Sequence, residues 1–281
     1  MTRKSIHLLI IDPQNDFCDL PETDRGDNTP ALPVPGAHAD MLRLAALIEQ
    51  GGQGIANITV TFDSHHRLDI AHPGFWTNAN GGPVAPFTQI HIGDVKAGAF
   101  RPRLAGVAPR VIAYLSALEA AGRYTHMVWP VHCELGAWGH NVHAAVRRAY
   151  HQWEDAAGVS VEKVLKGLNP LTEHYSAIRA EVPDPASIDT LTNNVLLDRL
   201  AAADTILIAG EAGSHCVKAT VEHIVEYRPD TACRIVLLAD CISPVSGFED
   251  AQQAFIETMR SRGARIAVST ELLPELRANA V

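Results

Sequence analysis

Three residues of types used in nucleophilic catalysis stand at the ends of short apolar runs: Asp12, Lys166 and Cys216. Cys216 stands where a helix is expected to begin, and the free N–H groups and dipole of a helix start favour a thiolate. The same N–H groups could hold an oxyanion. A carboxylate that emerges from a buried strand, as Asp12 does, can be a general base with a raised pKa. Lys166 beside them would stabilise a thiolate or bind an anion.

Each of these residues also has a structural interpretation when it is taken alone. Free cysteines are often small buried hydrophobes, which is an equal alternative for Cys216. Asp12 precedes a proline, so it could simply form a turn, and a lysine at a strand end is usually solvated. Asp16 is a second candidate carboxylate that could also only cap the turn after it.

A second group of residues has the character of metal ligands. Asp63 and His65 are two apart, so their side chains share a face if the strand geometry continues. His132 follows another predicted strand and could be a third ligand, which would leave positions open for water or substrate. The alternative is a polar loop in which His66 and His72 are surface groups, because Asp-x-His pairs also occur by chance.

Aromatic residues near these motifs could line a pocket, although each alone is more often core or lid: Phe17, Phe75, Trp76, Trp129 and Trp138. His140, His143 and His151 fit one face of a helix, and we expect satisfied side chains there rather than ligands.

The elements that must position these residues alternate along the chain. Apolar runs predict strands at 6–11, 55–62, 125–129, 159–165, 205–209, 233–239 and 265–268. Amphipathic stretches predict helices at 38–50, 107–121, 139–153, 193–202, 214–227, 248–262 and 271–278. This alternation favours an α/β fold, a doubly wound and mainly parallel sheet between helices. We expect one domain, 1–281, with a long insertion at about 64–105. Ligands of such sheets bind at the carboxyl ends of the strands, where the candidate residues stand.

Composition excludes several classes of function. The 281 residues carry 23 basic and 32 acidic side chains, a net charge of −9, and no basic stripe, so we expect no nucleic-acid partner. No apolar run approaches the length of a membrane span, and the N-terminal apolar stretch is too short for a secretory signal. Five scattered cysteines argue against a disulfide framework and favour the cytoplasm.

Four stretches, in order, resemble the cysteine hydrolase superfamily of nicotinamidases, N-carbamoylsarcosine amidase-like enzymes and isochorismatases. They are residues 8–17 (LLIIDPQNDF), Lys166 with 173–176 (EHYS), 208–220 (IAGEAGSHCVKAT), and the pair 63–65 (DSH) and 129–133 (WPVHC). The last pair is similar to the metal-ligand segments of nicotinamidases in particular. The resemblance covers most of the chain apart from the insertion, which makes the span between His65 and His132 longer than is typical.

The resemblance implies the three-layer isochorismatase-like fold and roles for individual residues. Cys216 would be the nucleophile, Asp12 the general base and Lys166 the stabilising cation. A non-proline cis peptide at Glu211–Ala212 would help to aim the N–H groups of Ala212 and Cys216 at an oxyanion.

It further implies Zn²⁺, or else Fe²⁺ or Mn²⁺, on Asp63, His65 and His132, with His72 as an open further candidate. The substrate would be a small nicotinamide-like carboxamide beside Phe17 and Trp129, hydrolysed through a Cys thioester with release of ammonia. A homo-oligomer is implied, for which the insertion offers candidate contacts: Phe75, Trp76 and Phe87. Alternatives are an N-carbamoyl or other small-amide hydrolase, a metal-water hydrolase with an inert Cys216, and a non-catalytic ligand-binding protein.

Overall fold

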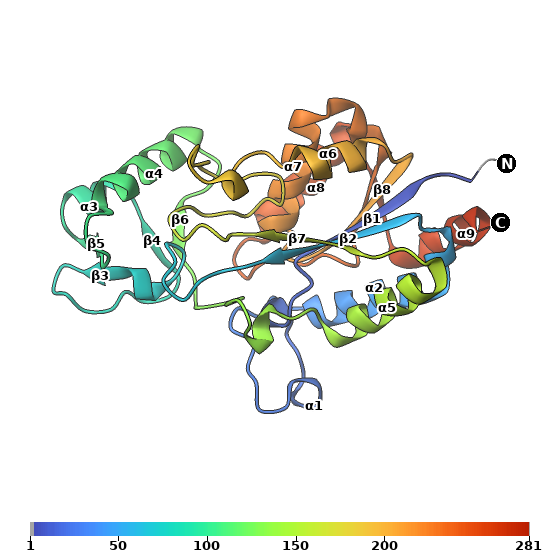
Figure 1. The fold of residues 1–281 in the computed structure, drawn as a ribbon, viewed down its shortest axis with the longest axis horizontal. Helices are drawn as coiled ribbons and strands as arrows, with labels where there is room; N and C mark the ends of the chain where they lie inside the picture. Colours follow the sequence, from blue (N-terminus) through green and yellow to red (C-terminus); the bar gives the residue numbers. More distant parts are fainter. Residues whose placement is uncertain (1–2, 281) are drawn as a thin grey trace.

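The computed structural model describes residues 3–280 and is built around a six-stranded parallel sheet (Figure 1). Its strand order is β10-β9-β8-β1-β2-β7, and every neighbouring pair is parallel. The strands are β1 (Ile6–Ile11), β2 (Asn57–Asp63), β7 (Glu162–Lys166), β8 (Thr205–Gly210), β9 (Ile235–Leu238) and β10 (Arg265–Ala267). β1 and β9 are buried throughout and β8 is buried except at Thr205, as expected for strands covered on both faces.

Helices cover both faces of the sheet, which confirms the predicted three-layer α/β fold. One face carries α2 (Ala37–Gly51), α5 (Ala144–Ala157) and α9 (Ser269–Asn279), and the other carries α6 (Asn194–Ala201), α7 (Cys216–Tyr227) and α8 (Glu249–Ser261) (Figure 1). The predicted apolar face of α2 is the buried one: Met41, Leu44, Ala45 and Ile48. Burial of such a face, rather than helix propensity, supplies most of a helix's stability.

The segment 64–105 lies beyond the carboxyl ends of the strands, at the left of Figure 1. It contains β3 (Trp76–Asn78), β4 (Thr88–Ile90), α3 (Ile92–Lys96) and β5 (Phe100–Pro102), and α4 (Ala108–Ala121) follows it. β3 and β5 form a two-stranded antiparallel sheet. The expected strand at 125–129 exists as β6 (His126–Val128), but it pairs with β4 outside the main sheet. The division into one domain with an insertion stays a prediction.

This region has a hydrophobic core of its own, and that core corrects part of the expected subunit contact. Phe75 and Trp76 are fully buried in it, beside Tyr114, Leu115 and their neighbours. They therefore cannot be surface contacts. Phe87 is 56% exposed and remains a candidate, and the homo-oligomer stays a prediction.

The helix expected at 139–153 begins later, at Ala144, because His143 caps it by accepting a hydrogen bond from the Ala145 N–H. His140 lies in a preceding 3-10 turn, so the three histidines do not share a helical face. The remaining short elements are α1 (Glu22–Arg25) and 3-10 turns at Asn15–Phe17, Gly52–Gly54, Pro73–Phe75, Trp138–His140, Ile188–Thr190 and Pro229–Arg234.

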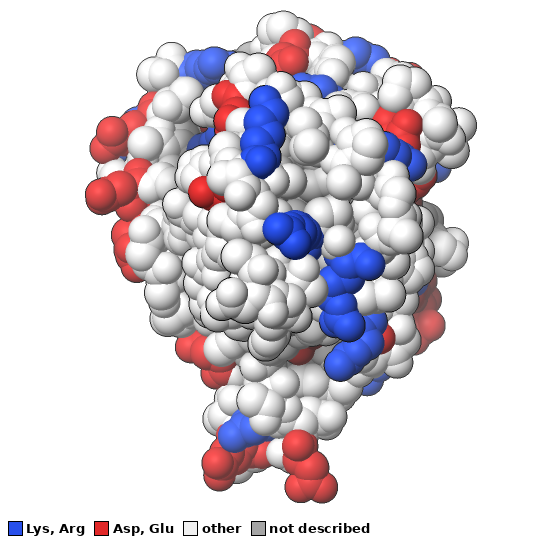
Figure 2. All heavy atoms as spheres, turned by 90° about the vertical axis from the view of Figure 1, so that its left-hand side faces the viewer, with Lys and Arg blue, Asp and Glu red and all other residues white. Residues whose placement is uncertain are grey.

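Charge is unevenly distributed over the molecule. On the face that carries the 64–105 segment, Lys and Arg lie across the middle and Asp and Glu gather at the left edge and lower tip (Figure 2). Within residues 3–280 no helix combines the length and apolar character needed to cross a membrane. All five cysteines are free, as expected.

Candidate active site

The loop between β8 and α7 brings Cys216 to the carboxyl end of the sheet. Cys216 is the first residue of α7. The Glu211 N–H donates to the Ile11 carbonyl at 2.8 Å, which fixes the loop against the end of β1. A Cβ at Gly210 would lie 1.9 Å from the Ile11 carbonyl oxygen, so only glycine permits this approach. The peptide bond between Glu211 and Ala212 is cis, as the resemblance implies.

Lys166, at the end of β7, lies between the other two predicted catalytic residues, Asp12 and Cys216. Its Nζ lies 3.0 Å from Asp12 Oδ2 and 3.6 Å from Cys216 Sγ. It also lies 2.8 Å from Asp63 Oδ1 and donates to the His174 carbonyl at 3.0 Å. The lysine side chain is 1% exposed. A buried ammonium needs this many partners to offset its desolvation.

The electrostatics of this group differ from the simple expectation for Cys216. Burial raises the pKa of the Cys216 thiol well above its usual range, and Lys166 only partly opposes this. The helix start therefore does not hold a thiolate at rest. Burial also raises the pKa of Asp12, against the opposing effect of Lys166. Burial acts to lower the pKa of Lys166, but Asp12 and Asp63 outweigh it and raise the pKa well above its usual range.

Asp12 is oriented by the neighbouring strand β2. Thr61 Oγ1 donates to Asp12 Oδ1 and accepts from the Asp12 N–H at 3.1 Å. Asp12 has a φ of 44°, which non-glycine residues rarely adopt and which is common at functional sites. Its other oxygen, Oδ2, faces Lys166. Asp16, the second candidate carboxylate, accepts instead from the N–H groups of Cys133 and Ala31, so it fixes loops.

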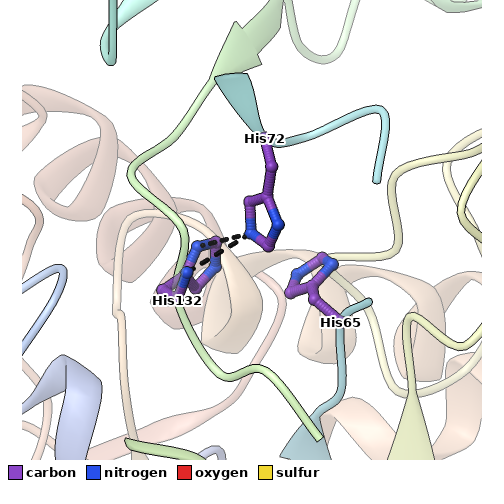
Figure 3. A group of neighbouring side chains, drawn as sticks. All are labelled: His65, His72 and His132. Carbon is purple, nitrogen blue, oxygen red and sulfur yellow. Dashed lines mark hydrogen bonds between the residues drawn. The ribbon is translucent and has the colours of Figure 1, made fainter. Parts of the chain in front are cut away.

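The candidate metal ligands converge from separate segments of the chain. His65, His72 and His132 point toward one another, and their ligand atoms lie within 4.8 Å of one another (Figure 3). Asp63 Oδ2 lies 3.0 Å from His65 Nε2 and 3.2 Å from His132 Nε2. The alternative of His72 as a surface group is therefore wrong, whereas His66 is exposed.

Each of these histidines turns its Nδ1 toward an oxygen atom of the protein, and Nε2 of His72 also lies 3.4 Å from the His132 N–H. His132 Nδ1 lies 2.8 Å from the Pro130 carbonyl and His72 Nδ1 lies 3.1 Å from the His66 carbonyl. His65 Nδ1 lies 3.1 Å from Asp69 Oδ2. A proton on Nδ1 facing these oxygens would direct the Nε2 lone pairs toward a metal ion.

These donors fit a divalent metal ion. Ligands about 2.0–2.1 Å from a tetrahedral ion lie about 3.3 Å from one another, close to the separations that Asp63 makes with His65 and His132. Burial lowers the pKa of His72 to about 2, so this ring is neutral and able to coordinate. Three imidazoles and a carboxylate suit Zn²⁺, Fe²⁺ or Mn²⁺.

A small cavity separates the metal-ligand cluster from the nucleophile. Cys216, Ala212, Asp63 and His132 line it, and so do the predicted substrate-binding residues Phe17 and Trp129. Its volume is about 20 Å³. Trp138, Phe75 and Trp76 are not among its lining residues, so the expected aromatic pocket consists of fewer members.

Comparison with known proteins rests on structure alone. No family model matches the sequence, and no curated protein matches it. The nicotinamidase/pyrazinamidase of Acinetobacter baumannii aligns with a TM-score of 0.62 and 19% identity, covering 97% of this chain and 100% of that one. The yeast nicotinamidase aligns at 0.60 and 19%, covering 94% and 99%. The Pyrococcus horikoshii pyrazinamidase, solved with zinc, aligns at 0.53 and 18%, covering 94% and 99%.

This chain has the isochorismatase-like fold of the nicotinamidases. The fold explains why residues distant in sequence meet, since β1, β2, β7 and β8 are neighbours in its sheet. Asp12, Asp63, Lys166 and Cys216 follow or end these four strands.

Two residues of this candidate site escaped the sequence analysis. Asp69 faces His65 Nδ1, and no motif marks it apart from its spacing of four residues from that histidine. Glu173 lines the cavity with Oε2 buried and without a hydrogen-bond partner among the described residues. Burial raises the pKa of Glu173 to about 7. Its position in the EHYS segment was the only available signal.

Proposed function

We propose that this chain is a metal-dependent cysteine amidohydrolase that releases ammonia from a small, nicotinamide-like carboxamide. The observation that carries the proposal is the position of Lys166, whose Nζ lies within 3.6 Å of Asp12, Asp63 and Cys216. A non-catalytic protein has no need for a buried lysine between two carboxylates and a thiol, because that arrangement is costly to desolvate. Similarity in fold to nicotinamidases supports the same reading.

The reaction begins with a neutral thiol, in keeping with the raised pKa of Cys216. Asp12 accepts the thiol proton as the sulfur attacks the carbonyl carbon of the amide, and Lys166 stabilises the developing sulfur charge. The N–H groups of Ala212 and Cys216 hold the oxyanion of the tetrahedral intermediate, a contribution of about 3–4 kcal/mol when one donor is removed in other enzymes.

Collapse of the tetrahedral intermediate breaks the carbon–nitrogen bond. Asp12 returns its proton to the nitrogen, ammonia leaves and a Cys216 thioester remains. Asp12 then takes a proton from water as the water oxygen attacks the thioester carbon. The carboxylic acid leaves, and the proton returns from Asp12 to the Cys216 sulfur.

Asp63, His65 and His132 would hold the metal ion, with His72 as a further ligand. When bound, the ion would act as a Lewis acid to which a ring nitrogen of the substrate could coordinate. This would orient the carboxamide toward Cys216. Zinc is the proposed ion because of the nitrogen-rich donor set and the zinc in the Pyrococcus horikoshii neighbour. Phe17 and Trp129 would flank the substrate ring, and Trp129 is fixed by donating from Nε1 to Tyr175 Oη at 3.1 Å.

The test is ammonia release from nicotinamide by zinc-loaded protein, with Cys216→Ala beside it. We expect release by the natural chain and none by Cys216→Ala, while folding and metal content stay the same. Cys233→Ala is the matched control because Cys233 is an exposed free thiol. Elemental analysis of protein grown with zinc, iron and manganese identifies the metal.

Iodoacetamide separates this mechanism from hydrolysis by a metal-bound water. In the Cys233→Ala background it should inactivate the enzyme in step with alkylation of Cys216. Full activity after complete alkylation of Cys216, or ammonia release by Cys216→Ala, would refute the nucleophile. Folded, zinc-loaded protein that is inert toward nicotinamide but releases ammonia from an N-carbamoyl amino acid would favour the related hydrolase.

A further inference from the structure

A second cavity adjoins the catalytic one and is lined by cations. It has a volume of about 170 Å³. Trp129, Tyr175 and His215 line both cavities, so the two meet at this aromatic wall. Arg123 and Lys218 also line this outer cavity. A substrate larger than a single ring would extend from Cys216 past this wall into it.

Lys218 is held over an aromatic ring with its ammonium only loosely paired. Nζ lies 4.7 Å from the centre of the Tyr124 ring and 3.4 Å from Tyr124 Oη. Its one carboxylate contact is Glu222 Oε2 at 3.3 Å. The same oxygen accepts from Arg123 at 2.9 Å. Two cations thus share one carboxylate oxygen.

Among the described residues, Glu222 is the carboxylate that forms ion pairs with Arg123 and Lys218. Glu181 is buried, and burial raises its pKa to about 7 against the opposing effects of Arg123, Arg179 and Lys218. It is therefore partly protonated at neutral pH. Burial lowers the pKa of His215 to about 4 and that of His223 to about 3, so these rings are neutral. The cavity keeps a positive potential that suits an anion.

We propose that Lys218, supported by Arg123, is a specificity-determining residue that binds a carboxylate on the substrate, so that the preferred substrate is a small amide with a second, anionic end. The inference rests on the proposed amidohydrolase. The carboxamide would lie at Cys216 and the carboxylate over Lys218, with Trp129 and His215 between them. Lys218 stands two residues after Cys216 on α7, so one helix positions both ends of the substrate.

Matched pairs of amides test this selectivity. Succinamate is compared with butyramide, and 5-carbamoylpyridine-3-carboxylate with 5-methylnicotinamide, so that each pair differs mainly in the carboxylate. In at least one pair we expect kcat/KM for the anion to exceed that for its partner by tenfold or more. Lys218→Met should reduce this ratio at least tenfold, and Lys218→Arg should retain most of it. Lys163→Met, an exposed lysine on β7, removes the same charge elsewhere and should leave the ratio unchanged.

A binding measurement keeps the test independent of turnover. In the Cys216→Ala background, calorimetry should show tighter binding of the anionic amide than of its neutral partner, and this difference should disappear with Lys218→Met. Equal binding and equal kcat/KM within both pairs would overturn the anion site while leaving an amidohydrolase intact. A ratio that Lys218→Met does not change would also overturn it. Absence of turnover in all amides, with selective binding retained, would instead reject the proposed function and leave the anion site standing.

Discussion

The carboxylate of Asp63 lies 2.8 Å from the ammonium of Lys166, at the centre of the site. Its other oxygen, Oδ2, lies 3.0 Å from His65 Nε2. Burial acts to raise the pKa of Asp63, but His65 and Lys166 outweigh it and hold the pKa well below its usual range. One carboxylate thus connects Lys166 and the nucleophile to the metal-ligand cluster. We therefore expect a substitution in either group to alter the electrostatics of the other.

Removal of the lysine charge should destabilise the protein as well as inactivate it. Lys166→Met leaves Asp12 and Asp63 buried without their shared cation. Breaking a buried ion pair in this way costs about 3–5 kcal/mol. We expect a loss of that size in the free energy of unfolding, measured by urea denaturation of metal-free protein, together with loss of ammonia release.

A double-mutant cycle shows whether the unpaired carboxylate causes the loss. Asp63→Asn in the Lys166→Met background removes one stranded charge and should recover part of the stability. Lys163→Met, whose lysine is exposed, is the control and should change stability by less than about 0.5 kcal/mol. Strict additivity of Lys166→Met and Asp63→Asn would show that the two side chains do not interact.

Asp69 should tune metal affinity without binding the metal itself. It faces His65 Nδ1 at 3.1 Å and so fixes the ring with Nε2 toward the other ligands. Loss of such an outer partner typically weakens metal binding by about 10–100-fold. We expect this for Asp69→Asn in competition titrations with a chromophoric zinc chelator, and a larger loss for His132→Ala.

His140→Ala is the matched control for the zinc titrations. His140 contacts Ser64 Oγ at 2.9 Å but lies outside the group of candidate ligands. The His140→Ala variant should bind zinc with the affinity of the natural chain. Equal affinity in Asp69→Asn and the natural chain would show that the carboxylate does not orient His65.

Acid should lower the free energy of unfolding, because buried histidines bind protons more readily in the unfolded chain. His7 allows this loss to be measured at a residue outside the candidate active site. His7 is buried in β1 with Nε2 2.8 Å from Thr59 Oγ1, and burial lowers its pKa to about 4. The unfolded chain binds a proton below about pH 6.5, whereas the folded chain does so only near pH 4. Stability is therefore full above pH 6.5 and lost as the pH falls toward 4, by about 3 kcal/mol from this residue.

Urea unfolding at pH 7.0 and pH 4.5 measures this loss. His7→Gln cannot take up the proton, so it should lose less stability between the two pH values than the natural chain does. His151→Gln, which changes an exposed histidine on α5, should keep the natural pH dependence. An unchanged pH dependence in His7→Gln would place the titrating histidines elsewhere.

The convergence of Asp12, Lys166 and Cys216 could be predicted from the sequence because each is tied to a local pattern, whereas their catalytic roles are a proposal. Asp12 and Lys166 stand at the ends of apolar strands, and Cys216 stands at a helix start. Parallel pairing then brings such ends together whatever the loops between them do. Most boundaries of strands and helices follow from the same apolar periodicity.

The rest depends on tertiary contacts that no local pattern encodes. β6 was predicted as a strand from its apolar residues, yet it pairs with β4, a strand of the 64–105 segment, outside the main sheet. His72 belongs to a loop without periodicity, and only the folded segment brings it to His132. The prediction of a lowered pKa for Cys216 at the helix start is wrong, because burial of the thiol raises its pKa. The position of a residue in a helix does not reveal how deeply it is buried.

The hydrophobic core around Phe75 and Trp76 should support the candidate metal site, and Trp76 tests this. Trp76 is fully buried and donates from Nε1 to the Ile70 carbonyl at 2.7 Å. This bond closes the segment that carries His72. Trp76→Ala should cost about 3–5 kcal/mol, as for other buried aromatic residues, and it should weaken zinc binding because His72 loses its support.

Phe87→Ala is the control, because it removes an aromatic residue of the 64–105 segment that lies outside this core. Phe87 is exposed, and its ring meets the Trp129 ring edge-on at a centroid distance of 6.0 Å. Its removal should cost less than about 1 kcal/mol and leave zinc affinity unchanged. If Trp76→Ala lowers stability but binds zinc as tightly as the natural chain, then His72 is positioned by the carbonyl contact within its own loop, and the core around Trp76 serves stability alone.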